Sequence, residues 1–78
     1  MLIRSQDNKK ITNDLCLEII ENEYTHSFEI FNNSVGVIGE YSTEEKAIKV
    51  LDEIFRAFRN MAFVDVVTFQ MPQDNEVS

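Results

Sequence analysis

The chain has 78 residues, a formal net charge of −7 and a single cysteine, Cys16. This length fits one domain, which buries only about 60% of the surface exposed by its unfolded chain. One cysteine excludes an internal disulfide, and the excess of carboxylates disfavours binding to nucleic acid or anionic membranes because phosphate groups are repelled. Hydrophobic residues make up 44% of the chain, which argues against disorder.

We expect a cytoplasmic protein without a signal peptide. Met1 is followed directly by Leu2 and Ile3, with no basic region and no long apolar core. No apolar run approaches the roughly 18 to 20 residues that a transmembrane helix needs. A single thiol also fits a reducing compartment.

The N-terminal part predicts three strands, over residues 2–5, 10–12 and 15–21, separated by polar turns. In the third strand, alternation puts Leu15, Leu17 and Ile19 on one face. Cys16, Glu18 and Ile20 fall on the other face.

Two further strands are expected over residues 24–31 and 35–41, joined by a hairpin turn at Asn32-Asn33. In the first of them, alternation groups aromatic and aliphatic residues with the only histidine: Tyr24, His26, Phe28 and Ile30. In the second, Val35, Val37 and Tyr41 are predicted to share one side.

One amphipathic helix is predicted over residues 43–60. Ser42 and Glu45 have the spacing of a capping box, and Asn60 is the expected C-cap. Steps of three and four residues produce one apolar stripe, which consists of Ala47, Ile48, Leu51, Ile54, Phe55 and Phe58. A last strand is expected over residues 64–71 and ends at Pro72, which cannot donate to a ladder.

The element order β-β-β-β-β-α-β predicts an α+β fold, with one antiparallel sheet of five to six strands and a single helix on one face. We expect one domain over residues 1–72 and a polar, disordered tail over residues 73–78. A single helix leaves the second sheet face uncovered, with Cys16, Ile20, Phe31 and Ile38 on it.

The residues do not form a recognisable catalytic or metal site. His26 is expected to be a partly buried structural residue, and Cys16 lacks the nearby cations that activate a thiol. One cysteine and one histidine cannot supply a zinc site within one chain. Gly36 and Gly39 have the spacing of a nucleic-acid-clamping GxxG loop, but no basic residue accompanies them. We therefore expect no enzyme activity and no cofactor.

The polar run Arg4 to Asp7 and the residue Gln70 lie at predicted strand ends, where they could form a recognition edge. Antiparallel pairing of the first and last strands would place them near opposite ends. Together with the uncovered face, they form the expected interaction surface: Arg4, Gln6, Cys16, Ile20, Phe31, Ile38 and Gln70.

Three stretches carry a resemblance: residues 3–7 (IRSQD), residues 38–47 (IGEYSTEEKA) continuing to 50–54 (VLDEI), and residues 69–72 (FQMP). They resemble a group of short, single-domain proteins of Firmicute bacteria and their phages. That group has no assigned activity, so the resemblance implies a bacterial or prophage cytosolic origin and transfers no functional residues.

Three functions are compatible with these features. The first is a non-enzymatic protein-interaction module that self-associates, with a dimer the expected form. The second is a phage-type inhibitor that mimics a polyanion and binds a basic protein. The third is a small-ligand binder with a site between protomers, to which His26, Arg4 or Tyr41 could contribute.

Overall fold

A computed structural model describes residues 1–60 and 68–78 of the chain as an α+β fold with two small sheets. The terminal sheet has the order β2-β1-β6, and the meander sheet has the order β3-β4-β5. The strands are β1 (Leu2–Arg4), β2 (Ile11–Thr12), β3 (Leu17–Glu21), β4 (Phe28–Asn32), β5 (Gly36–Tyr41) and β6 (Thr68–Gln70). The helices are α1 (Glu44–Asn60) and the short 3-10 helix η2 (Asp74–Glu76). Residues 64–67 of the expected last strand lie outside the described residues.

The prediction of one continuous sheet was wrong. β1 stops at Arg4 because a turn begins at Ser5, whose N–H donates to the carbonyl of Lys10 at 2.8 Å. Asn8 supports this turn in the left-handed region, at φ 65°. Within the turn, Gln6 connects the two sheets by donating its backbone N–H to Ile38 O at 2.8 Å.

β1 and β6 pair in parallel, with Arg4 opposite Gln70. These two residues therefore lie side by side, and not at opposite ends as antiparallel pairing would have required. Gln70 Nε2 donates to the carbonyl of Ser5 at 3.0 Å, which fastens the end of β6 to the start of the turn.

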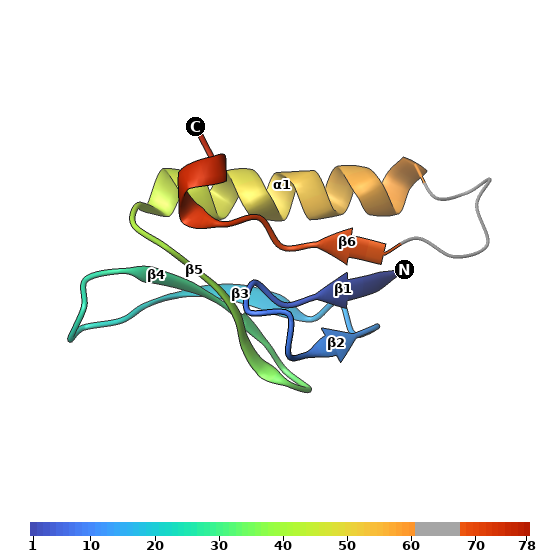
Figure 1. Ribbon diagram of the computed structural model, residues 1–78, viewed down its shortest axis with the longest axis horizontal. Helices are drawn as coiled ribbons and strands as arrows, with labels where there is room; N and C mark the ends of the chain where they lie inside the picture. Colours follow the sequence, from blue (N-terminus) through green and yellow to red (C-terminus); the bar gives the residue numbers. More distant parts are fainter. Residues whose placement is uncertain (61–67) are drawn as a thin grey trace.

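The predicted helix is present and lies along one side of both sheets (Figure 1). Its N-cap is Thr43 and not Ser42, because Thr43 Oγ1 accepts from the N–H of Lys46 at 3.2 Å. The N-cap therefore lies one residue later than expected, and the expected capping box of Ser42 with Glu45 is not formed, because the residue three positions after Thr43 is Lys46, whose side chain has no acceptor. Ala47, Val50 and Ile54 are its buried residues, so the buried stripe is narrower than the predicted one.

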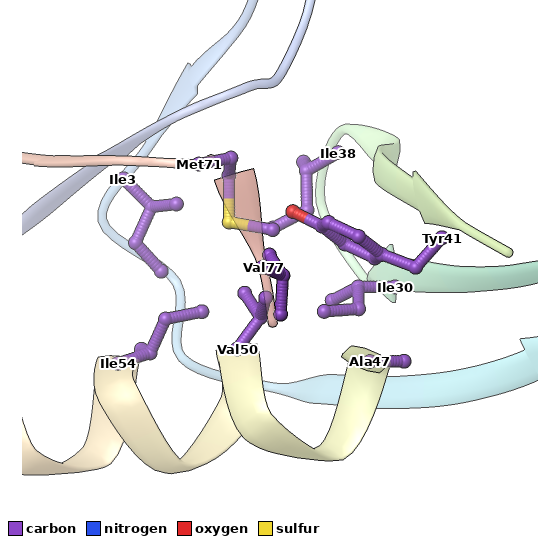
Figure 2. Close-up of a cluster of buried hydrophobic side chains, with 9 residues drawn as sticks. All are labelled: Ile3, Ile30, Ile38, Tyr41, Ala47, Val50, Ile54, Met71 and Val77. Atoms are coloured by element: carbon purple, nitrogen blue, oxygen red, sulfur yellow. The ribbon is translucent and has the colours of Figure 1, made fainter. Parts of the chain in front are cut away.

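The core lies where the helix meets both sheets (Figure 2). It consists of Ile3, Ile30, Ile38, Tyr41, Ala47, Val50, Ile54, Met71 and Val77. The Tyr41 hydroxyl donates to Pro72 O at 2.8 Å, and burial raises the pKa of this phenol. The core therefore joins the meander sheet to the C-terminal segment.

A β-bulge explains why Ile38 is in the core and not on the uncovered face. Ile30 pairs with Gly39 and Phe31 pairs with Val37. Ile38 is therefore the extra residue of the bulge and has no partner residue on β4. The alternation of β5 changes at this point: Ile38 and Gly39 are both buried, whereas Val37 is exposed.

The turn between β3 and β4 is longer than predicted and includes His26. Asn22 Oδ1 accepts from the N–H of Tyr24 at 2.9 Å and of Thr25 at 3.3 Å, an Asx-type arrangement that competes with a strand. His26 has φ 57° and is exposed, which corrects its expected place as a partly buried strand residue.

Residues 73–78, for which a polar, disordered tail is predicted, include the short helix η2 and contact the start of α1. η2 lies beside the start of α1 (Figure 1), and Val77 enters the core. Asp74 Oδ1 accepts from Ser42 N–H at 2.8 Å, and Lys46 forms an ion pair with the same carboxylate at 3.4 Å. The described part of the chain contains no helix long and apolar enough to cross a membrane.

Candidate protein-interaction surface

The outer edge of β5 is blocked by one side chain, that of Gln6. Its Oε1 accepts from Glu40 N–H at 2.9 Å, while its Nε2 donates to Glu40 O at 3.2 Å and to Pro72 O at 3.1 Å. Together with its backbone bond to Ile38, Gln6 occupies the polar groups that another strand would use. Gln6, one of the residues of the expected interaction surface, therefore connects the end of β1 to the edge of β5 and to Pro72.

Among the described residues, none covers the outer edge of β3 in a comparable way. Asn33 donates to Cys16 O and Asn22 donates to Ser27 O, so the even-numbered residues of β3 point their backbone groups at β4. The N–H and C=O groups of Leu17, Ile19 and Glu21 therefore point outward. No hydrogen bond from residues 1–60 or 68–78 reaches these groups. Such an edge is a template for an added strand.

An apolar groove lies between β3 and the second half of α1. It has a volume of about 280 Å³ and is lined by Leu15, Leu17, Leu51, Ile54, Phe55 and Phe58. Phe55 is 61% exposed and Phe58 is 43% exposed, although both belong to the predicted buried stripe. The Arg59 guanidinium stacks over the Phe55 ring, 5.8 Å from its centroid, and supplies a charge at the groove.

The outer face of the meander sheet, on the side away from the core, mixes apolar and acidic residues. Cross-strand pairs place Glu18 beside Phe31, Ile20 beside Glu29, and Glu29 beside Glu40. Ile20 is 40% exposed and Val37 is 37% exposed. This outer face therefore holds apolar residues among three carboxylates, those of Glu18, Glu29 and Glu40.

Cys16 lies at the margin of this face, in a shallow hollow with Phe31. The neighbouring Asp14 carboxylate raises the pKa of the Cys16 thiol through a hydrogen bond and through its charge. A raised pKa reduces the thiolate fraction, so the chemistry of this exposed thiol is not that of an activated nucleophile.

A polar hollow of about 270 Å³ lies near the N-terminal end of α1 and is lined by Thr25, His26, Ser27, Glu40, Tyr41, Ser42 and Asp74. Ser27 Oγ is 2.7 Å from Thr25 Oγ1, and Asp74 binds Ser42 and Lys46. These groups hold the turn and the tail in place. In the described ranges, no three His, Cys, Asp or Glu side chains gather closely enough to bind a metal ion.

The residues expected to form one interaction surface are divided among three places. Cys16, Ile20 and Phe31 share the outer face of the meander sheet. Ile38 is 2% exposed in the core. The remaining three, Arg4, Gln6 and Gln70, lie together at the end of the terminal sheet.

Sequence reasoning missed the groove and Tyr24. Phe55 and Phe58 belong to the predicted apolar stripe of α1, but the sheets cover only part of that stripe. The buried residues of the helix are Ala47, Val50 and Ile54, so both phenylalanines remain exposed. Tyr24 is 96% exposed because it lies in the turn held by Asn22. The Asn22 side chain was the available signal for that turn.

Comparison of the chain with protein families, curated proteins and solved structures found no match. The surface features of the chain itself are therefore the basis for a functional proposal.

Proposed function

We propose that this protein is a non-enzymatic interaction module that associates with a second copy of itself. The observation that supports it best is the edge of β3, which no described residue pairs with, beside the apolar groove. An added strand can satisfy the outward backbone groups while its side chains bury the groove, which is the mode of β-strand addition. The exposed Cys16 thiol fits the expected cytoplasmic location.

Self-association would also add stability to a domain of this small size. A chain of 78 residues has a limited core, and a partner subunit is one of the usual ways in which small domains gain stability. The exposed Phe55 and Phe58 would then be covered by the partner.

A pair of matched substitutions on α1 tests this proposal. Phe55→Ser removes an exposed ring from the groove, and Ile48→Ser removes an exposed aliphatic residue of the same helix outside it. We expect Phe55→Ser to raise the dissociation constant of the dimer about tenfold, equivalent to about 1.4 kcal/mol. Ile48→Ser should leave it unchanged. Sedimentation equilibrium over a concentration series measures both; a monomeric wild-type protein at tens of micromolar would contradict the proposal.

Binding of a basic protein is a second candidate function, supported by the distribution of charge. Residues 11–45 contain no Lys or Arg, so the meander sheet presents carboxylates without neighbouring cations from its own strands. Glu18, Glu29 and Glu40 surround exposed apolar residues there, which suits a cationic partner with an apolar side.

Charge-matched variants test the second candidate. Glu18→Gln, Glu29→Gln and Glu40→Gln combined should weaken binding to poly-lysine more than a control with Glu44→Gln, Glu45→Gln and Asp52→Asn on α1. Both triple variants have the same net charge, so titration at low and high salt separates a local surface from a general charge effect. Equal weakening in both would rule out a dedicated acidic surface.

A further inference from the structure

The exposed edge of β3 is suited to pair with its own copy. In an antiparallel pair related by a two-fold axis at Ile19, this residue faces Ile19 of the second copy. Leu17 then faces Glu21 of the second copy. All three residues point their backbone groups outward from the meander sheet, so these facing pairs are the ones that exchange hydrogen bonds.

The same register avoids opposition of like charges. On the outer face, Glu18 lies opposite Ile20 of the second copy and not opposite another glutamate. Stacking two outer faces against each other would instead bring Glu18, Glu29 and Glu40 of both copies together, which is unfavourable. Avoidance of like-charge repulsion therefore favours edge pairing of two copies over face stacking.

The two-fold register also determines which part of the second copy Tyr24 approaches. It follows β3 in the turn held by Asn22, so in the two-fold register it comes to the level of Asp14 and Leu15 of the other chain. Leu15 lines the groove. A 96% exposed aromatic ring and an open apolar groove are then brought together twice, once on each side of the axis.

We infer that two copies pair through their β3 edges and that Tyr24 of each copy inserts into the apolar groove of the other. This inference rests on the proposed function and specifies the partner surface and its anchor residue. The assembly is a six-stranded sheet in which the two helices lie on one side and the two acidic outer faces on the other.

A fluorescence reporter tests the anchor directly. The chain contains no tryptophan, so Tyr24→Trp introduces a single one at the proposed contact. We expect its emission at high protein concentration to be blue-shifted and to move to longer wavelength on dilution, in parallel with dissociation measured by sedimentation. Emission typical of exposed tryptophan at every concentration, in a protein that is dimeric by sedimentation, would overturn the anchor.

Two paired variants test the mode of association. Tyr24→Ser should raise the dissociation constant roughly 10-fold to 100-fold, whereas His26→Asn, in the same turn but facing the polar hollow, should not. Glu21→Pro removes an outward backbone N–H and should abolish dimerisation. Glu21→Ala keeps this N–H, and we expect it to dimerise. Circular dichroism verifies that each variant is folded.

The outcomes separate this inference from the proposed function. If Phe55→Ser weakens the dimer but Tyr24→Ser and Glu21→Pro do not, the groove is an interface and the inferred pairing is wrong. If the wild-type protein is monomeric throughout, both the self-association and its inferred geometry are wrong.

Discussion

Single residues determine which strand edge is available. Gln6 covers the β5 edge with two side-chain hydrogen bonds to Glu40, whereas the described residues place no such side chain on β3. Asn22 determines the conformation of the turn between β3 and β4. Its carboxamide oxygen accepts hydrogen bonds from the turn backbone, and Tyr24 is exposed in this turn. The proposed β3 interface thus depends on two amide side chains that do not belong to it.

Gly39 is required by close approach and not by its backbone angles. An added Cβ would lie 2.9 Å from Met71 Cε and 3.0 Å from Tyr41 Cε2. We expect Gly39→Ala to lower the free energy of unfolding by about 1–3 kcal/mol, because the packed core has no space for the methyl group. Val37→Ala, at an exposed site on the same strand, should change it by less than about 1 kcal/mol. Urea denaturation measures both, and equal stability of the two variants would show that Met71 moves aside freely.

At the scale of elements, residues 73–78 pack against the start of α1 and are called the latch below. Asp74 binds Ser42 and Lys46, and Lys46 Nζ also donates to Asp74 O at 3.1 Å. Val77 places an apolar side chain in the core beside these polar contacts. The latch explains why Ser42 does not serve as the helix N-cap: its hydroxyl and N–H are engaged by Asp74.

The latch predicts a pH dependence of stability. The Ser42 N–H, followed by the Ser42 hydroxyl and Lys46, lowers the pKa of Asp74 below its ordinary value of 3.8. A carboxylate with a lowered folded-state pKa stabilises the fold above its unfolded pKa, and this contribution disappears as pH falls through the folded-state pKa.

Asp74→Ala should therefore lower Tm at pH 7, and the difference in Tm from wild type should shrink as the pH falls below 3.8. Thermal melts from pH 7 to pH 2 measure this difference. Asp52→Ala removes an exposed carboxylate from the middle of α1 and serves as the control. A Tm difference between Asp74→Ala and wild type that stays constant with pH would contradict an ionic role for Asp74.

At the scale of the whole molecule, charge and apolar surface are distributed unevenly. The Lys and Arg residues fall within residues 1–10 and 46–59, so the meander sheet is acidic while the terminal turn and α1 carry the cations. The apolar groove opens between the acidic sheet and the mixed helix, with Arg59 at the groove. This separation leaves the β3 edge compatible with a second copy and the outer face compatible with a basic protein.

The amino-acid sequence by itself determined the fold class, the single helix and the approximate position of most strands. Local signals suffice for these features: alternation in β3, three-and-four spacing in α1, and polar turn residues between them. The grouping of Cys16, Ile20 and Phe31 on one face was also predictable, since alternation along each strand and simple hairpin pairing specify it.

Only the tertiary structure decided the division into two sheets, the parallel pairing of β1 with β6, and the burial of Ile38. Each depends on contacts between residues far apart in the chain, such as Gln6 with Glu40, which local periodicity does not contain. The same is true of the groove, because the exposed part of the α1 stripe depends on which residues the sheets cover. Local preferences specify elements, whereas packing between distant segments specifies which of their surfaces remain free.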